Sequence, residues 1–548
     1  MKLIKKLFLS LLAVSMLAGC GGNGKADGEI TINLGSEPPE MLTFLTTDTT
    51  SGNVLRHVIE TLIRLDENNK AAPGVAKEVP TKENGGVSED GKTIVFNLNP
   101  DAKWHNGDPV TAQDFEFAWD QLFKLSNGGN YASTWAPLIK GASEVLACQD
   151  DASYEKALEN KGWKASEDGL TFTVELTGPY VYFVNLMAFY SFAPVQEKAY
   201  VAGGGLDKYG NDVEGYLMNG PFVIESWEHE SNLVLVKNEN YWNKDAVKLN
   251  KITMEMISDS NTAMNVFDDG TCDMIGISGD YVQTYKDNGV DVKEYGDGST
   301  WYFEFNTAQP GLNNAKVRKA LTYAYDVPQF VEKLIKNSSA DAKTFTPKAI
   351  NGGDFSKAMG DLYNRTYDDK QWADAKALLE EGLKEEGIKV EDFSLTILGD
   401  VSDTAKKNYE YFQAQWQEHL GIKVEIQQVE FQDRLNKMDQ KDFGVVFAGW
   451  GPDYDDPMTF LDLWVTDGGN NHTSWSNAEY DECVAKALVE ADATKRMEYL
   501  KRCEEIIATE FPVGVIYERN RSYLTSERLH GVIRNAFSDI DLTKAYTK

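Results

Sequence analysis

Residues 394–448 read SLTILGDVSDTAKKNYEYFQAQWQEHLGIKVEIQQVEFQDRLNKMDQKDFGVVFA, and this stretch decides the fold class. Apolar side chains recur at alternate positions in some segments and at helical spacings in others. The pattern predicts strands at 394–398, 422–426 and 443–448, with helices at 403–420 and 431–438. The last strand is apolar without interruption, which is typical of a strand covered on both faces. Strands that alternate with helices in this way predict a parallel α/β sheet.

The remainder of the 548 residues continues the same mixture of strands and helices. Short strands are predicted at Glu29–Leu34, Thr93–Leu98, Thr171–Leu176, Asn232–Val236 and Lys251–Ile257, and helices at Lys316–Ala324, Lys370–Glu386, Ala478–Glu490 and Lys495–Ala508. Single hydrophobic cores stop growing at about 250–300 residues, so a chain of this length is expected to form two or three lobes.

The loop that follows the uninterrupted strand, residues 449–457, has an unusual composition. Gly449 and Gly451 allow another backbone to approach closely, and Trp450 offers a large flat apolar surface. A carboxylate follows at Asp453. An exposed strand edge that ends in a carboxylate is suited to binding an extended peptide by its main chain and its α-ammonium group. The alternative is an ordinary turn with solvated acids.

The N-terminus predicts export from the cytoplasm. A basic start precedes the apolar run Leu7–Leu17, which is too short for a membrane span, and residues 1–19 therefore form a predicted signal peptide. Leu17-Ala18-Gly19-Cys20 resembles the lipobox of bacterial lipoproteins, which implies a diacylglyceryl thioether on Cys20. Residues 20–28 then form a flexible tether to an extracytoplasmic domain held at the membrane. Ordinary secretion with an incidental cysteine is the alternative.

The formal net charge of −32 narrows the choice of partners. Nucleic acid is excluded as a partner because its phosphates require a basic surface. The acidity serves solubility or attracts cationic ligands, and the sequence leaves both readings open.

Sequence patterns of enzymes and metal sites are missing. The chain has no G-x-S-x-G and no H-E-x-x-H, and its six histidines are dispersed, so we expect no catalytic residue, no metal and no cofactor. Cys483 and Cys503 lie at nearly equal distances from the turn between two predicted helices. They form either a disulfide or a pair of reduced thiols.

Several segments in the same order along the chain resemble the extracellular solute-binding proteins that serve ABC transporters, a family that includes oligopeptide- and dipeptide-binding proteins. The segments are Gly35–Pro39, Trp104–Phe115, Phe305-Asn306 with Val317–Leu321, Gly449-Trp450 with Asp453–Pro457 and Phe460, and more weakly Asn219–Phe222. Much of this resemblance is structural, since Thr111 and Asp114 fit a helix capping box and Arg318 is expected to orient a helix through a salt bridge.

The resemblance implies a set of ligand-binding residues. Asp453 matches the carboxylate that binds the peptide α-ammonium, and the edge Gly449–Gly451 matches the strand that bonds the peptide main chain, with Trp450 also walling side-chain pockets. Tyr131 and Tyr517 match tyrosines of the cleft. The enterobacterial oligopeptide binders have an arginine where this chain has Phe447, so one cationic partner for a peptide C-terminus is missing.

The resemblance also implies the architecture and the function. We expect a bilobed α/β fold of the periplasmic-binding-protein type with a hinge. The expected parts are lobe I (29–65, 191–297 and 523–548), an inserted domain (66–190) and lobe II (298–522). The implied function is a monomeric, lipid-anchored protein that captures short peptides for the permease of an ABC importer. The alternatives are another solute on the same scaffold, namely a nickel chelate, haem, an opine or an oligosaccharide, and a sensor of peptide signals.

Overall fold

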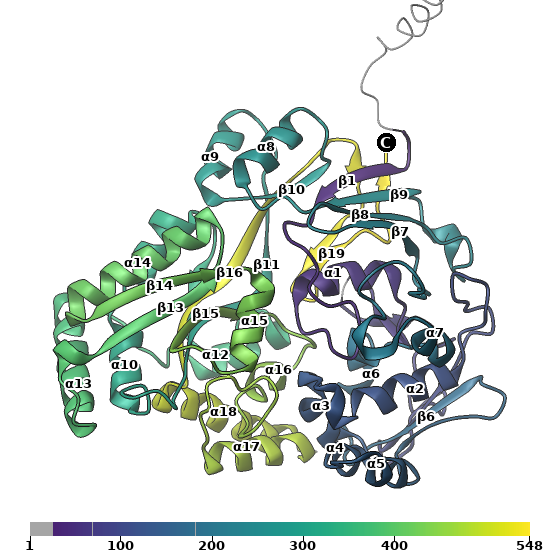
Figure 1. The fold of residues 1–548 in the computed structure, drawn as a ribbon, viewed down its shortest axis with the longest axis horizontal. Helices are drawn as coiled ribbons and strands as arrows, with labels where there is room; N and C mark the ends of the chain where they lie inside the picture. Colours follow the sequence, from purple (N-terminus) through teal and green to yellow (C-terminus); the bar gives the residue numbers. More distant parts are fainter. Residues whose placement is uncertain (1–25, 68, 181, 491) are drawn as a thin grey trace, which may run out of the picture.

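The computed structural model describes residues 26–548 except 68, 181 and 491, and one mixed sheet crosses the whole molecule (Figure 1). The predicted signal peptide and Cys20 lie outside the described residues. In the order in which they pair, the strands are β14 (Lys423–Val429), β13 (Ser394–Asp400), β15 (Val445–Trp450), β11 (Lys293–Phe305), β16 (Val513–Thr525), β10 (Met274–Ile277), β1 (Glu29–Asn33), β9 (Lys251–Glu255), β8 (Asn232–Lys237) and β7 (Phe222–Glu228). The short β12 (Ala340–Asp341) pairs with β16 beside this path.

The stretch quoted first forms one end of this sheet. α14 (Asp403–Leu420) connects β13 to β14, α15 (Phe431–Asp439) connects β14 to β15, and β13 pairs in parallel with both neighbours. The apolar stripe of α14 is buried, with Phe412 and Trp416 fully inaccessible. The predicted parallel α/β arrangement is confirmed. The strand bounds differ, since β15 continues to Trp450 and therefore includes two residues assigned to the following loop.

Two long strands join the two halves of the sheet. β11 and β16 each span 13 residues and run antiparallel, with a register shift between Gly296 and Thr300. β11 pairs with β15 in one half, whereas the end of β16 pairs with β10 in the other half. The expected lobe boundaries at 297/298 and 522/523 fall inside these two strands.

The other half of the sheet and its neighbouring domain supply the opposite side of the molecule. β1 lies in parallel between β9 and β10, and α1 (Thr49–Val58) begins at Asp48, whose carboxylate accepts the Ser51 N–H. A separate sheet of β4 (Thr93–Asn97), β6 (Thr171–Glu175) and β5 (Trp163–Ala165) packs against α2 (Ala112–Leu122), and α3 (Asn130–Trp135) follows α2 in the chain. The capping box at the start of α2 is confirmed, because the Asp114 carboxylate accepts the Thr111 N–H at 2.8 Å.

The helices of the lower left of Figure 1 complete the half that contains β15. α10 (Ala315–Tyr323) packs against α13 (Asp369–Glu385), and α17 (Ala478–Val489) packs against α18 (Ala493–Glu510). Cys483 and Cys503 face each other across the second pair as buried free thiols. No helix within the described part of the chain is both long and apolar enough to cross a membrane.

Arg318 on α10 orients its helix in a different way from the one expected. Its guanidinium is buried and donates to backbone carbonyls: Leu312 and Asn313 before the helix, and Glu510 and Phe511 at the end of α18. None of the described carboxylates forms an ion pair with it, so the predicted salt bridge is wrong. Five N–H donors in a planar fork suit the carbonyls at the C-terminal end of α18, which have no intrahelical partner, together with two carbonyls of the loop before α10.

We expect Arg318→Met to lower the free energy of unfolding by about 3 kcal/mol, because buried carbonyls would lose their donors. Urea denaturation measures this loss. Arg502→Met is the matched control: its guanidinium pairs at the surface with Glu479, and surface pairs contribute less than about 1 kcal/mol. Equal small losses in both variants would contradict the role of Arg318.

Candidate functional site

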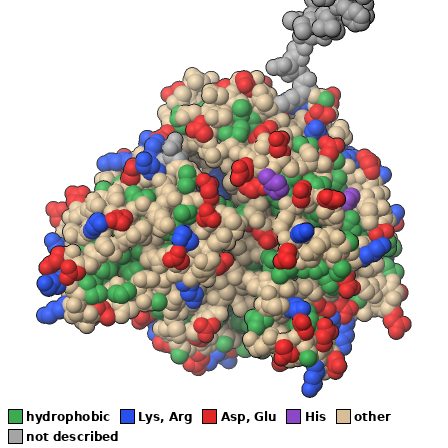
Figure 2. Space-filling model, in the orientation of Figure 1, with side chains coloured by type: hydrophobic (Ala, Val, Ile, Leu, Met, Phe, Trp, Pro, Cys, Tyr) green, Lys and Arg blue, Asp and Glu red, His purple; other side chains and the backbone are tan. Residues whose placement is uncertain are grey.

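A cavity of about 1010 Å³ lies between the two halves of the molecule. Its walls come from the end of β15, the joining strands β11 and β16, the start of α1, and the segments that contain Tyr131 and Tyr190. Acidic side chains are spread over both halves of the face seen in Figure 2. Because its walls include the end of the parallel strand β15, the cavity lies where ligands are expected in α/β sheets, outside the carboxyl ends of the strands.

The end of β15 offers an open strand edge to this cavity. β13 pairs with β15 only at Val445 and Val446, whereas β11 pairs with it as far as Trp450. The edge of residues 448–450 that faces away from β11 thus has no neighbouring strand in the described sheet. Such an edge presents main-chain donors and acceptors to an incoming extended chain.

The two glycines that flank Trp450 differ in their surroundings: Gly449 is closely packed, whereas Gly451 lies in open space. A Cβ on Gly449 would lie 2.7 Å from the Trp301 indole, so a side chain there would displace the ring. A Cβ on Gly451 would meet no atom within 4 Å. The structure brings Gly449, Trp450 and Gly451 to the cavity together, as the sequence predicts.

Asp453 lies next to this edge with a carboxylate that has no cationic partner. Both of its oxygens accept from the Tyr131 hydroxyl at 2.9 Å, and among the described residues no Lys, Arg or His forms an ion pair with it. Although the side chain is only partly covered, the surrounding protein desolvates it. Desolvation, with a smaller contribution from Asp462, raises the pKa of the Asp453 carboxyl well above its usual value. An incoming cation would relieve this penalty.

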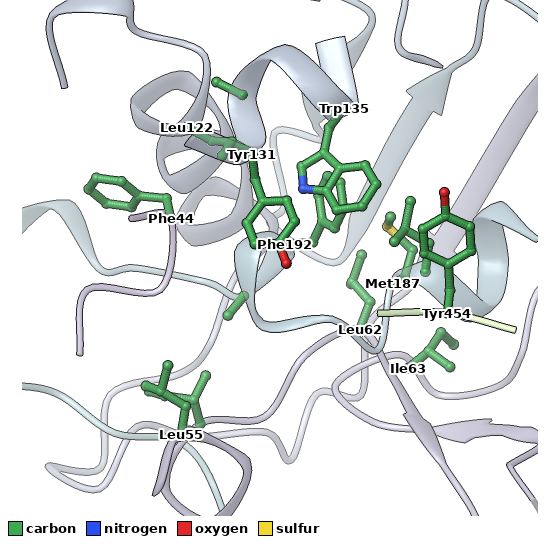
Figure 3. Close-up of a cluster of buried hydrophobic side chains, with 14 of the residues drawn as sticks. Phe44, Leu55, Leu62, Ile63, Leu122, Tyr131, Trp135, Met187, Phe192 and Tyr454 are labelled. Carbon is green, nitrogen blue, oxygen red and sulfur yellow. The ribbon is translucent and has the colours of Figure 1, made fainter. Parts of the chain in front are cut away.

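Tyr131 reaches Asp453 from the other side of the cavity. Its ring stacks on Trp135 with centroids 5.2 Å apart, contacts Phe189 edge-on, and lies 6.2 Å from Trp450. Figure 3 shows Tyr131 beside Trp135 in this buried cluster. The predicted site residues Tyr131, Trp450 and Asp453 therefore meet, although two of them are more than 300 residues from the third.

The other acids of the loop have structural roles. Asp456 forms a two-pronged ion pair with Arg496, with both N–O distances 2.8 Å, and Asp455 accepts the Asn351 N–H at 2.6 Å. Neither side chain lines the cavity. Of the three carboxylates, only Asp453 faces the ligand space.

Tyr517 is not brought to the cavity, so its predicted ligand contact is not supported by the structure. Its ring is buried in the core beneath the sheet, where it stacks on Trp301 with centroids 6.2 Å apart and contacts Phe330. Its neighbour two residues on, Arg519, does line the cavity and covers the outer part of Trp301.

Charged residues that the sequence did not indicate line the cavity where the strands cross between the halves. Asp297 on β11 accepts from Arg519 at 2.6 Å and from Arg521 at 2.8 Å, both on β16. Asp297 also accepts from the Ser299 N–H, within the register shift of β11. Only the pairing of two distant strands creates this cluster, so no local signal could have identified it.

A second cluster missed by the sequence centres on His472. Its Nδ1 lies 3.4 Å from Glu304 Oε2, and its Nε2 lies 3.4 Å from Asp439 Oδ1. Desolvation acts to lower the pKa of His472, but the two carboxylates outweigh it and raise that pKa to about 9. The imidazole is therefore protonated at neutral pH.

The fold should lose stability at alkaline pH because of this histidine. With a pKa raised from 6.5 to about 9, His472 stabilises the folded state fully below pH 6.5, and this contribution disappears as the pH rises through 9. We expect the difference in unfolding free energy between wild type and His472→Gln to shrink by up to about 3 kcal/mol over that range. Chemical denaturation at several pH values measures it. Parallel pH profiles would contradict the ion pairs.

The described residues contain no group of three or more His, Cys, Asp or Glu side chains placed to hold a metal ion. The chemistry of the cavity is thus an open strand edge, a carboxylate that lacks a cation, aromatic walls and two clusters of charged residues.

Comparison with known proteins gives consistent results. The family profile described as "Bacterial extracellular solute-binding proteins, family 5 Middle" matches residues 70–472. The chain is similar to the oligopeptide-binding protein OppA of Bacillus subtilis, with 34% identity over 98% of each chain. It is also similar to the dipeptide-binding protein DppE of the same organism, with 29% identity over 99% of each chain.

Solved structures show the same bilobed solute-binding fold. The substrate-binding domain of an oligopeptide ABC transporter from Bacillus anthracis matches with a TM-score of 0.86 and 33% identity, over 95% of this chain and 99% of that one. OppA of Listeria monocytogenes bound to peptide matches with a TM-score of 0.86 and 29% identity, over the same shares of the two chains. The predicted fold class is therefore confirmed.

Proposed function

The chain belongs to the bacterial extracellular solute-binding proteins of family 5, and we propose that it captures short peptides outside the cell and delivers them to an ABC importer. The observation that carries the proposal is the open edge of β15 next to a desolvated carboxylate without a cation. The names of the relatives above support a peptide ligand. In this proposal the protein binds its ligand without catalysis and uses no cofactor.

In this proposal the peptide becomes an additional strand beside β15. Its main chain bonds residues 448–451, its α-ammonium pairs with Asp453, and Trp450 walls the space for side chains. About six main-chain hydrogen bonds at about 1 kcal/mol each, with about 1.5–3 kcal/mol from the ammonium–carboxylate pair, exceed an association cost of several kcal/mol. Micromolar affinity requires about −8 kcal/mol, which apolar side-chain burial can complete.

Closure of the two lobes around the peptide is supported by contacts that join the two sides of the molecule. Tyr131 donates to Asp453, and Tyr182 stacks on Tyr454 with centroids 4.8 Å apart while Arg496 covers the Tyr182 ring. Tyr131 and Tyr182 belong to the proposed inserted domain (66–190), and their partners belong to proposed lobe II (298–522). The crossing strands β11 and β16 are the proposed hinge, and the working form is a monomer.

We expect Asp453→Asn to weaken binding of short peptides with a free N-terminus by about 10- to 100-fold, because the neutral amide cannot balance the ammonium charge. N-acetylated versions of the same peptides should lose less than about threefold. Isothermal titration calorimetry measures both series. Asp455→Asn, on the same loop but outside the cavity, is the matched control and should change neither. Equal losses in the two peptide series would remove Asp453 from this role.

We further propose that a diacylglyceryl thioether on Cys20 holds the protein at the outer face of the cell membrane, with the residues before Gly28 as a tether. The expected end of the tether at residue 28 is corrected, because Gly28 is buried and its N–H donates to Thr547. The support is the sequence Leu17-Ala18-Gly19-Cys20 after the short apolar run. One or two acyl chains anchor a protein by burial of methylene groups at about 0.8 kcal/mol each.

Cys20→Ser should release the protein from the membrane fraction and abolish incorporation of labelled fatty acid in growing cells. Immunoblots of membrane and medium, together with autoradiography, measure these two effects. Cys148→Ser is the control, since Cys148 is a partly exposed thiol of the folded domain, and it should keep both label and anchor. Label retained by Cys20→Ser would place the lipid elsewhere.

A further inference from the structure

One part of the main cavity is lined by β11, the end of β15, α15 and the segment 463–472, on the face of the sheet that carries Ala448 and Trp450. We call it the acidic side pocket, and it is formed by Tyr302, Glu304, Asp439, Ala448, Trp464 and His472. Side chains of an added strand point alternately to opposite faces of the sheet. Alternate side chains of a peptide bound beside β15 would therefore project toward this pocket.

The walls of the pocket are apolar near the strand edge and charged farther in. Tyr302, Ala448 and Trp464 are each less than 5% exposed. Farther along β11, Glu304 is 2% exposed, and its Oε2 accepts no hydrogen bond from any described residue. The nearest cation, His472, approaches it only at the ion-pair distance given above. His472 and Asn470 also line the cavity. His472 Nδ1 and the Asn470 amide nitrogen likewise have no hydrogen-bond partner among the described residues.

The charges of this region leave one negative charge in excess. Arg434 neutralises Asp400, with its Nε 2.7 Å from Oδ1. Glu304 and Asp439 then share the single positive charge of His472. A buried carboxylate with an unused acceptor oxygen calls for one more cationic donor.

We propose that the acidic side pocket accepts a lysine or arginine side chain of the bound peptide. The aliphatic stem of such a side chain would pack on Tyr302, Ala448 and Trp464, and its cationic head would donate to the carboxylates of Glu304 and Asp439. A neutral side chain would leave the carboxylate oxygen unsatisfied, and an acidic one would add to the excess negative charge. This inference rests on the proposed capture of peptides and makes the protein selective for basic ones.

The experiment compares alanine-based pentapeptides that carry arginine or citrulline at position 2, 3 or 4. Citrulline has nearly the shape of arginine but lacks its charge. In calorimetric titrations, wild type should bind the arginine peptide about tenfold more tightly than the citrulline peptide at one position. Glu304→Gln should bring this ratio to within about twofold of unity. Glu230→Gln is the control, because Glu230 is an exposed acid on the opposite wall of the cavity, and it should leave the ratio unchanged.

Two further variants separate a charge effect from damage to the fold. His472→Gln removes the competing cation and should raise the arginine-to-citrulline ratio severalfold, a direction that unfolding cannot produce. Asp439→Asn, at a half-exposed position, should lower the ratio about threefold, and it serves as the test should Glu304→Gln fail to fold.

The outcomes also distinguish this inference from the proposed function. If the all-alanine parent peptide fails to bind wild type, the proposed capture of peptides is wrong, and the pocket assignment that rests on it is wrong as well. If the parent binds but the ratio is near unity at every position, only the basic-side-chain pocket is overturned. A ratio that Glu304→Gln, or Asp439→Asn in its place, leaves unchanged overturns it as well.

Discussion

The early end of the pairing between β13 and β15 is the constraint on which the rest of the site depends. β13 accompanies β15 only at Val445 and Val446, while β11 continues beside it to Trp450. A strand with one satisfied edge and one open edge is held rigidly in place and still offers its main chain to a ligand. Neighbours on the satisfied side also fix the approach, since the Trp301 indole fills the space that a side chain on residue 449 would need.

Continuity of the sheet determines what faces this edge. β11 pairs with β15 in one half and with β16, and β16 continues to pair with β10 in the other half. This unbroken pairing places the edge of β15 opposite the start of α1 and the helix that carries Tyr131. The joining strands contribute charge at the same point, because the register shift in β11 exposes Asp297 to the two arginines of β16. The irregularity of the ladder and the ion cluster thus arise from one local feature.

The sequence predicted those parts of the site whose residues are neighbours in the chain. Gly449 to Asp453 follow one another, and the uninterrupted apolar strand before them leads to the end of the sheet that borders the cavity. Tyr131 could be assigned only through resemblance, since nothing local distinguishes it from a core tyrosine. Glu304, Asp439 and His472 come from three separate segments and meet only in the folded chain. Tyr517 was assigned through the same resemblance, and the local sequence could not correct this assignment, because residues 513–517 of β16 are buried on both faces and no alternation indicates which face lines the cavity.

The carboxylate of Asp453 also explains why ligand binding and closure should be coupled. A ligand shifts a conformational equilibrium only by the difference between its affinities for the two states. With the lobes together, Tyr131 supplies one hydroxyl donor to Asp453, which does not offset the loss of water around a negative charge. With the lobes apart, water would solvate the carboxylate and the charge would cost nothing. In the proposed mode of binding, an ammonium group would therefore stabilise the closed form more than the open one, and the desolvation penalty on the empty closed form would couple binding to closure.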